Sequence, residues 1–196
     1  MDGTICRLGG KSLDQEGYDM LGLICGSEGL LGVITEVTVK ILKKPQTAKA
    51  ALIGFSTHED GGNCVSEIIA NGIVPAGMEI MDKALIEATD NFSKAGYPRD
   101  VELLLIVELD GTVSEVDELI NKVSEISKKN NSSTIKISKN EKERLSFWIG
   151  RKAAFPACGA MAPDYYCMDG SIPRGKLAEA LKEINKLSKK YNLSVA

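Results

Sequence analysis

The sequence predicts an α+β fold with helices packed on one face of a mostly antiparallel sheet. From about residue 48, short strand-like runs alternate with amphipathic helical patterns, which need a sheet to cover. The run Val101–Leu109 is almost wholly apolar, as is typical of a central strand. With 196 residues, 43% of them hydrophobic and 26% charged, the chain can form one large domain plus a fragment of another.

The first 45 residues have a different pattern. They are rich in glycine and run into Val33–Ile41, where apolar and polar residues alternate. This alternation predicts a half-buried strand, which Lys43-Lys44-Pro45 ends. A glycine-rich stretch with one strand is typical of an arm or a remnant of a domain rather than a free-standing domain.

The next segments predict two strand–helix pairs. Ala51–Phe55 is a short apolar strand, and Glu59–Asn71 has apolar residues on one face of a helix. Met78–Met81 follows a Pro-Ala-Gly turn and is expected to form a second strand. Asp82 is then placed to cap a helix that runs to about Phe92.

Two more strands are predicted, one before and one after a long helix in the sequence. Val101–Leu109 is the predicted central strand, and an Asp-Gly turn follows it. Ser114–Lys129 is amphipathic with helical spacing, and Thr134–Ser138 alternates as an edge strand would.

The C-terminal third predicts mainly helix. Asn140–Ala154 is expected to be helical, with Leu145 and Trp148 facing the core. Tyr165–Met168 is a candidate strand, and Pro173–Tyr191 carries leucine and isoleucine at helical spacing.

The segment Arg151–Arg174 gathers polar groups that a helix or strand pattern does not explain. A guanidinium such as that of Arg151 suits a carboxylate, although a structural salt bridge is the ordinary role for an arginine one turn after Trp148. If the segment is a strand, Tyr165 and Tyr166 point to opposite faces, so at most one faces a site.

A glycine-rich stretch precedes the predicted strand at residue 33. Three glycines in Gly26–Gly32 allow a ligand to approach the backbone closely, and free N–H groups there can bond oxygen atoms. A tight turn before a strand explains the same pattern. The stretch is neither a P-loop nor a dinucleotide fingerprint, because no Gly-Lys-Ser/Thr follows and no helix begins there.

Two sets of motifs resemble a known family. Residues 2–44, with Gly17-Tyr18-Asp19 and Gly26-Ser27-Glu28-Gly29-x-x-Gly32-Val33-Ile34-Thr35-Glu36, resemble the end of the flavin-binding domain of FAD-linked oxidases of the vanillyl-alcohol-oxidase type. Met78-Glu79-Ile80-Met81-Asp82 through Trp148-Ile149-Gly150-Arg151-Lys152 resembles the ferredoxin-like, substrate-side cap domain of these enzymes. Arg151–Arg174 most resembles the flavoprotein (D) subunits of bacterial glycolate oxidases.

The resemblance implies two regions and a cofactor. Residues 1–46 would be a C-terminal remnant of the FAD-binding domain, and residues 47–196 a cap domain truncated at its C-terminus. FAD would lie along the loop and the strand after it, mainly through backbone contacts. The implied cofactor-binding residues are Gly26, Ser27, Glu28, Gly29, Gly32, Val33 and Ile34.

The resemblance also implies which residues bind substrate. Arg151 would hold a substrate carboxylate beside the flavin, and Tyr165, Tyr166 and Asp169 are further candidates. Ala160 stands where close relatives carry arginine, which puts a second carboxylate contact there in doubt.

The implied function is that of an FAD-dependent 2-hydroxy-acid dehydrogenase fragment. It would oxidise glycolate or D-lactate to the 2-oxo acid by hydride transfer to the flavin. A base must take the hydroxyl proton, and histidine is its usual source, but the chain has only His58, at a predicted exposed helix start. The catalytic base is therefore expected outside these 196 residues. The resemblance further implies that histidines which serve a metal or handle protons follow residue 196, and that the loop which grips the FAD pyrophosphate precedes residue 2. Alone, the fragment is expected to bind FAD weakly or not at all, and to be inactive.

The expected partners are a small 2-hydroxy acid, an iron–sulfur subunit that takes the electrons, and a second flavin-domain subunit. A net charge of −3 and a pI near 5.4 argue against nucleic acid, and no metal site is predicted in the chain. Five scattered cysteines without a CxxC pair, and no signal peptide, predict a cytoplasmic protein that reaches a membrane only through partners.

Two alternatives remain open from the sequence. One is a fragment of a D-lactate or D-2-hydroxyglutarate dehydrogenase, which shares the architecture. The other is a non-catalytic α+β module that binds a protein partner and derives from a split or degenerate gene.

Overall fold

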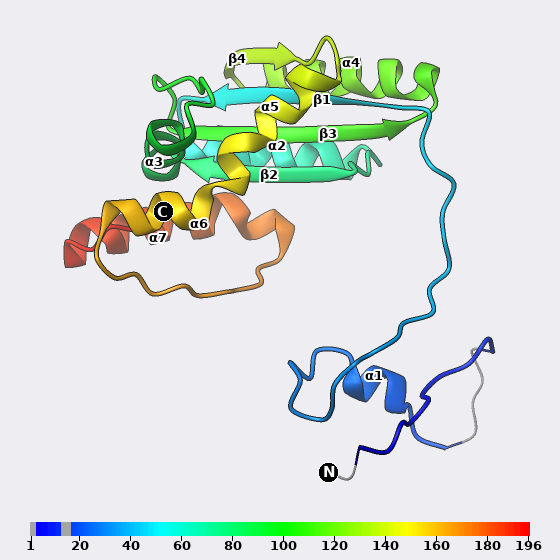
Figure 1. The fold of residues 1–196 in the computed structure, drawn as a ribbon. Coiled ribbons are helices and arrows are strands. Elements are labelled where there is room, and N and C mark those ends of the chain that lie inside the picture. The colour runs from blue at the N-terminus through cyan, green and yellow to red at the C-terminus, as the bar shows by residue number, and fades with distance from the viewer. Residues whose placement is uncertain (1–2, 13–16) are drawn as a thin grey trace. The chain divides into compact units, whose positions relative to one another are not determined.

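A computed structural model of the chain describes residues 3–12 and 17–196, and it divides into two units, Met1–Lys43 and Lys44–Ala196 (Figure 1). The predicted first region, residues 1–46, includes residues 1–2 and 13–16, which lie outside the described residues. None of the helices in the described ranges is long and apolar enough to cross a membrane.

The second unit is built on a four-stranded antiparallel sheet. Its strands are β1 (Thr47–Phe55), β2 (Gly77–Asp82), β3 (Leu103–Gly111) and β4 (Ser132–Ile137), in the spatial order β2-β3-β1-β4. All three strand pairs are antiparallel, and the central strands β1 and β3 pair over their whole length. The α+β class is confirmed, and so are four of the six predicted strands, those at Ala51–Phe55, Met78–Met81, Val101–Leu109 and Thr134–Ser138. This strand order is that of a ferredoxin-like sheet.

Two long helices cover one face of the sheet. The helices α2 (His58–Ala70) and α4 (Val113–Lys129) pack against alternate residues of β1 and β3. Thr112 and Glu115 form a capping box that fixes the start of α4. The buried residues on this face include Ile53, Phe55, Ile68, Leu103, Leu105, Val107, Val116, Ile120 and Val123.

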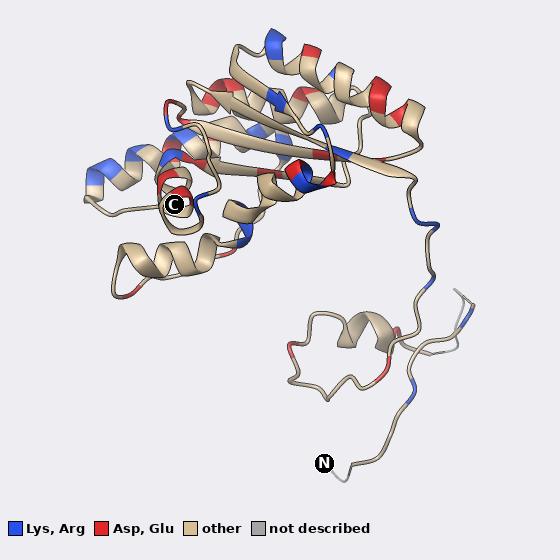
Figure 2. Ribbon diagram, turned by 45° about the horizontal axis from the view of Figure 1, so that its top comes forward, with Lys and Arg blue, Asp and Glu red and all other residues tan. Residues whose placement is uncertain are grey.

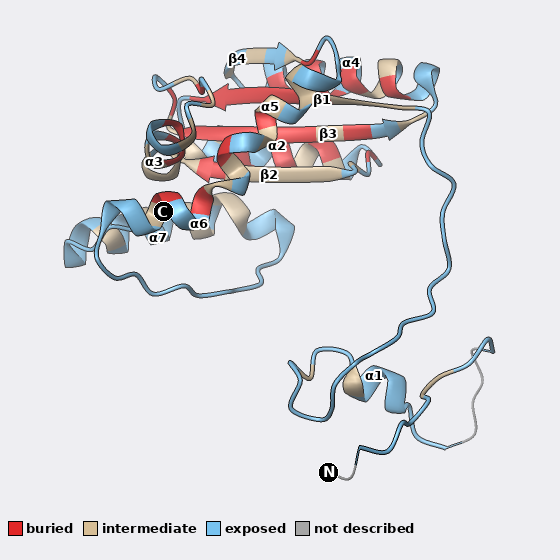
Figure 3. Cartoon of the chain, viewed as in Figure 1, coloured by how far each residue is buried: buried red, intermediate tan, exposed pale blue. Residues whose placement is uncertain are grey.

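The opposite face is also covered, by the shorter helices α3 (Lys83–Ser93) and α5 (Glu141–Lys152). The prediction of helices on one face therefore describes α2 and α4 but not these two. The cause is the composition of the central strands, where consecutive residues are buried on both faces (Figure 3). The second face buries Ala50, Leu52, Met81, Ile86, Tyr97, Val101, Leu104, Ile106 and Phe147.

The side chains that α5 buries differ from the predicted ones. Phe147 is 3% exposed and lies in the core, whereas Leu145 is 46% exposed, so its predicted inward position is wrong. Trp148 is partly buried, as predicted. Residues 145 and 147 are two positions apart and so lie on opposite sides of a helix, which means that burying Phe147 turns Leu145 outward.

Two helices extend the structure beyond α5. The helix α6 (Ala154–Met161), which the sequence pattern did not predict, packs against α3. The helix α7 (Leu177–Tyr191), preceded by the 3-10 turn Arg174–Lys176, packs against α2 and confirms the predicted last helix. Between them, residues 162–173 have neither helix nor strand, so the predicted strand Tyr165–Met168 is wrong. This segment links a helix on one side of the sheet to a helix on the other (Figure 1).

The first unit contains one short helix and irregular backbone. The helix α1 (Met20–Ile24) begins at Asp19, whose side chain accepts a hydrogen bond from the Gly22 N–H. No described residue of 3–43 is buried (Figure 3). The predicted strand Val33–Ile41 is wrong, because a strand requires a hydrogen-bonded neighbour and this segment is exposed and unpaired within the described residues.

Candidate functional site

Arg151 lies in the last turn of α5, at the edge of the sheet formed by β2. Its Nε donates a hydrogen bond to Oε2 of Glu79 at 3.0 Å, and the two side chains are 35% and 41% exposed. Glu79 lies on β2 and is 72 residues away in the chain. The ordinary role predicted for this arginine, a salt bridge, is therefore present.

A second carboxylate anchors the same helix. Oε1 of Glu108 accepts from Nη1 of Arg144 at 2.8 Å, and its Oε2 accepts from Nε1 of Trp148 at 2.7 Å. Gly77 lies opposite Glu108 in the β2–β3 register, so Glu79, two residues further along β2, projects from the same face of the sheet. The two carboxylates thus hold α5 at successive points along its length.

Gly77 allows α5 to approach β2 closely. A Cβ at this position would lie 3.2 Å from Cη2 of the Trp148 ring, which is tighter than ordinary van der Waals contact. The glycine therefore makes room for the indole, and the indole N–H reaches Glu108.

The Tyr97 hydroxyl forms hydrogen bonds with the backbone of α5 at Arg151 and one turn before it. It donates to the Phe147 carbonyl oxygen at 2.5 Å and accepts from the Arg151 N–H at 3.3 Å. The ring is 5% exposed. Burial raises the pKa of Tyr97, and the N–H groups of Arg151 and Gly150 only partly offset this, so the phenol stays neutral and keeps the proton that it donates.

The loop that carries Tyr97 is fixed by a buried carboxylate. Asp90, 8% exposed, accepts from the N–H groups of Gly96 and Tyr97 and from Nε and Nη2 of Arg99. Burial alone would raise the pKa of Asp90, but the hydrogen bonds from Arg99 and from the two backbone groups hold it below its ordinary value. Asp90 is therefore charged and fully bonded.

The guanidinium of Arg151 retains donors after these contacts. Nε is bonded to Glu79, but in the described chain Nη1 and Nη2 have no hydrogen-bond partner. Two parallel N–H groups at the end of a guanidinium match the two oxygens of a carboxylate. The site can therefore bind a carboxylate end-on without breaking the pair with Glu79.

The other predicted substrate residues lie on the irregular segment 162–173. Tyr165 and Tyr166 are 52% and 86% exposed, and Asp169 is exposed as well. Tyr165 lies beside Gly159 of α6, with its Cε1 3.8 Å from the position of a Cβ there. Within the described residues, no hydrogen bond joins these three side chains to Arg151, and their grouping with it stays a prediction.

Sequence reasoning missed Glu79 and Tyr97 as parts of the site. Glu79 stands in the quoted Met78–Asp82 motif, but its contact with Arg151 spans 72 residues and has no local signal in the sequence. Tyr97 stands in an Ala-Gly-Tyr-Pro loop that has no periodicity, and its contact with Arg151 spans 54 residues.

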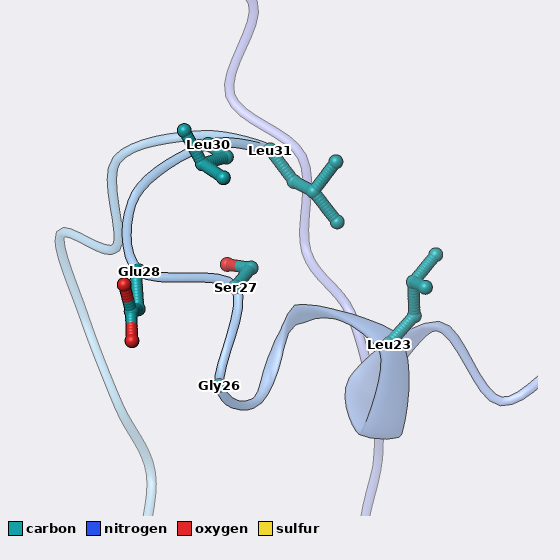
Figure 4. Close-up of a pocket in the computed structure, with 6 residues that line it drawn as sticks. All are labelled: Leu23, Gly26, Ser27, Glu28, Leu30 and Leu31. Carbon is teal, nitrogen blue, oxygen red and sulfur yellow. The ribbon is translucent and has the colours of Figure 1, made fainter. Parts of the chain in front are cut away.

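The glycine-rich loop of the first unit forms an open hollow of about 380 Å³, lined by Leu23, Gly26, Ser27, Glu28, Leu30 and Leu31 (Figure 4). Gly26, Glu28 and Gly29 have φ values of 82°, 51° and 80°, which explains the glycines at two of these positions.

Free donors in this loop fit a cofactor held by its backbone. Ser27 and Leu30 donate their N–H groups within the loop, whereas those of Gly26, Glu28 and Gly29 have no backbone partner in the described chain. A Cβ at Gly26, Gly29 or Gly32 would meet no atom within 4 Å, so a ligand can approach there. Val33 and Ile34 follow as exposed apolar residues.

Other groups of the described residues offer less chemistry. His58 begins α2, away from Arg151 in the fold. Nowhere in residues 3–12 and 17–196 do three or more His, Cys, Asp or Glu side chains gather in a way that could hold a metal ion. Lysine, arginine, aspartate and glutamate are interspersed on the helices around the sheet (Figure 2).

Comparison with known proteins places these features in a family. The family described as "FAD linked oxidases, C-terminal domain" matches residues 44–196. The glycolate oxidase subunit GlcD of Escherichia coli (strain K12) is 49% identical over 196 residues, which are 100% of this chain and 39% of that protein. GlcD of Bacillus subtilis (strain 168) is 33% identical over 99% of this chain and 42% of its own length.

Two further matches, one in sequence and one in structure, are more distant. The mitochondrial D-lactate dehydrogenase [cytochrome] of Arabidopsis thaliana is 33% identical over 87% of this chain and 30% of that protein. A solved structure of alkyldihydroxyacetonephosphate synthase superposes with a TM-score of 0.64 at 18% identity, covering 89% of this chain and 38% of that one, and shows the fold alone. The chain spans about two fifths of the length of the GlcD relatives that it matches. On the match over residues 44–196, the chain belongs to the FAD linked oxidases and carries their C-terminal domain.

Proposed function

We propose that this chain is part of an FAD-dependent dehydrogenase that oxidises a short 2-hydroxy acid, glycolate or D-lactate, to the 2-oxo acid. The observation that carries the proposal is Arg151, whose Nε is paired with Glu79 while Nη1 and Nη2 keep their donors. Relatives named as glycolate oxidase subunits and D-lactate dehydrogenases support the substrate class.

In this proposal the chain binds and orients the substrate. Arg151 takes the carboxylate through Nη1 and Nη2, and Tyr97 and Glu79 keep the arginine in place. FAD, when bound, would supply a hydride acceptor for the substrate α-carbon. Backbone N–H groups around Gly26–Gly29 and the apolar residues Val33 and Ile34 lie along the cofactor.

Tyr165, Tyr166 and Asp169 stay candidates for the substrate side. They stand on the exposed segment that links α6 to α7, where no helix or strand fixes them.

We also propose how the chain divides into domains and which partner takes its electrons. Residues 1–46 belong to the flavin-binding domain and residues 47–196 to the cap domain, and the structural division near Lys43 supports this boundary. The relatives named as subunits support an assembly in which electrons pass to a partner subunit, for which we propose an iron–sulfur protein.

The test is Arg151→Lys in the full-length enzyme, assayed with glycolate and with D-lactate against a dye acceptor. Lysine keeps the charge but loses the planar fork, so kcat/KM should fall about 10- to 100-fold, the size of one charge-assisted paired contact. Lys152→Ala, which removes the exposed neighbouring cation, should leave kcat/KM within about twofold, as surface substitutions usually do.

Two outcomes would contradict the proposal. Equal kcat/KM for Arg151→Lys and the unaltered enzyme would remove Arg151 from substrate binding. Absence of turnover with every short 2-hydroxy acid, in a full-length enzyme that contains FAD, would favour the non-catalytic protein-binding alternative.

A further inference from the structure

The strongest unassigned feature is the pair that joins β2 to the last turn of α5. Glu79 and Arg151 come from elements that are 72 residues apart, and both side chains are between one third and one half exposed. A pair this exposed adds little to stability, because water screens it. If the Glu79–Arg151 pair has a role, that role is therefore something other than stabilising the fold.

The geometry of the pair selects which part of the guanidinium stays available. Glu79 binds Nε with its Oε2 and leaves Nη1 and Nη2 without a hydrogen-bond partner in the described residues. The Tyr97 hydroxyl meanwhile binds the Arg151 backbone N–H, so the arginine is held at two points, one on the main chain and one on the side chain. An arginine held in this way has fewer rotamers to lose when a carboxylate arrives.

The neighbouring pair on the same helix has a different character. Arg144 and Glu108 are each 17% exposed, and Glu108 is further engaged by the Trp148 indole N–H. Both oxygens of Glu108 are thus used within the protein, and the group anchors α5 to β3. Glu79 has no such second partner in the described chain, although it stands on the same face of the sheet.

We infer that Glu79 is a positioning residue: it holds the Arg151 guanidinium with Nη1 and Nη2 directed at the substrate carboxylate. This rests on the proposed function, in which Arg151 binds that carboxylate. Glu79 does not touch the substrate, and its effect passes through Arg151.

The experiment uses Glu79→Ala, Glu79→Gln and Glu108→Gln in the full-length enzyme. Glu79→Ala should raise the KM for glycolate about tenfold, as a misplaced positioning group does, with kcat changed less than KM. Glu79→Gln keeps an oxygen that accepts from Nε and should give an intermediate KM. Acetate, which offers a carboxylate without the hydroxyl, should lose competitive affinity in the same order.

Glu108→Gln is the matched control, because it weakens an anchor on the same helix and the same sheet face. It should lower the melting temperature more than Glu79→Gln does and change KM less than twofold. An equal rise in KM for Glu108→Gln would assign the effect to displacement of α5 and overturn the inference. A lower KM in Glu79→Ala would also overturn it, since Glu79 would then compete with the substrate for Arg151.

Arg151→Ala separates this inference from the proposed function. If Arg151→Ala leaves KM unchanged, the proposed function fails at this residue. If Arg151→Ala raises KM but Glu79→Ala does not, the positioning role alone fails. The role of Glu79 also requires that Glu79→Ala adds nothing to KM in the Arg151→Ala background, because Glu79 acts through that arginine.

Discussion

At the scale of single residues, Asp90 is a buried carboxylate whose charged form is stabilised by hydrogen bonds. Four donors from Gly96, Tyr97 and Arg99 satisfy it, and they hold its pKa below the ordinary value of 3.8. A depressed pKa contributes stability that is present above pH 3.8 and is lost as the pH falls through the lower, folded-state pKa.

Asp90→Asn tests this linkage. The variant should lose about 1–3 kcal/mol of unfolding free energy at pH 7, because Arg99 and two N–H groups lose a charged acceptor. The deficit should shrink as the pH falls below 3.8, because the carboxylate of the unfolded chain then binds a proton while the native one, whose pKa is lower, still resists protonation. Urea unfolding at pH 7 and at pH 3 measures both values, and a deficit that does not depend on pH would contradict the assignment.

Tyr97 is a second residue whose polar atom acts inside the core. Tyr97→Phe removes the donor to the Phe147 carbonyl and the acceptor for the Arg151 N–H, with the ring retained. One buried hydrogen bond to a carbonyl and one part-buried contact with an N–H are lost, so the unfolding free energy should fall by about 1–3 kcal/mol. Tyr166→Phe, on a ring that is 86% exposed, is the control and should have no effect in the same urea titration.

The site was predictable at this scale only in part. Arg151 could be singled out because it stands in a contiguous sequence motif, and that motif resembles one in a known family. Glu79 and Tyr97 meet it across 72 and 54 residues, and no local pattern encodes such contacts. The grouping with Tyr165, Tyr166 and Asp169, which the family resemblance implies, stays a prediction.

At the scale of elements, Gly77 sets the distance between α5 and β2. Gly77→Ala would place a methyl group 3.2 Å from the Trp148 ring and force α5 to shift by a few tenths of an ångström. Overpacking of this kind costs about 1–3 kcal/mol. Trp148 is the only tryptophan, so its fluorescence emission should move to longer wavelength as the indole gains exposure.

The control for Gly77→Ala is Gly170→Ala on the exposed 162–173 segment. A Cβ at Gly170 would meet no atom within 4 Å, and the emission spectrum and stability should stay unchanged. An unaltered spectrum in Gly77→Ala as well would show that α5 does not depend on the missing Cβ.

Elements with strong local signals were predictable, and those that depend on partners were not. The cap at Asp82 and the amphipathic pattern of residues 113–129 identify α3 and α4 without reference to the rest of the chain. Val33–Ile41 also alternates like a strand, but a strand exists only when another strand pairs with it. Coverage of the second sheet face followed from β1 and β3 having consecutive buried residues, a signal that was present in the apolar run at residues 103–107.

At the scale of the whole molecule, all stability is expected to come from the second unit. Every buried residue that the structure describes lies between Ala50 and Ala157, and none lies in residues 3–12 or 17–43. Because burial of apolar surface dominates folding free energy, removal of residues 1–43 should leave the thermal midpoint within about 2 °C of that of the 196-residue chain.

Leu105→Ala, at a fully buried position in β3, should by comparison cost about 2–5 kcal/mol in either length of chain. Calorimetry of both chains, with and without this substitution, measures all four values. A fall of more than about 5 °C on truncation would mean that the first unit contributes to the cooperative core.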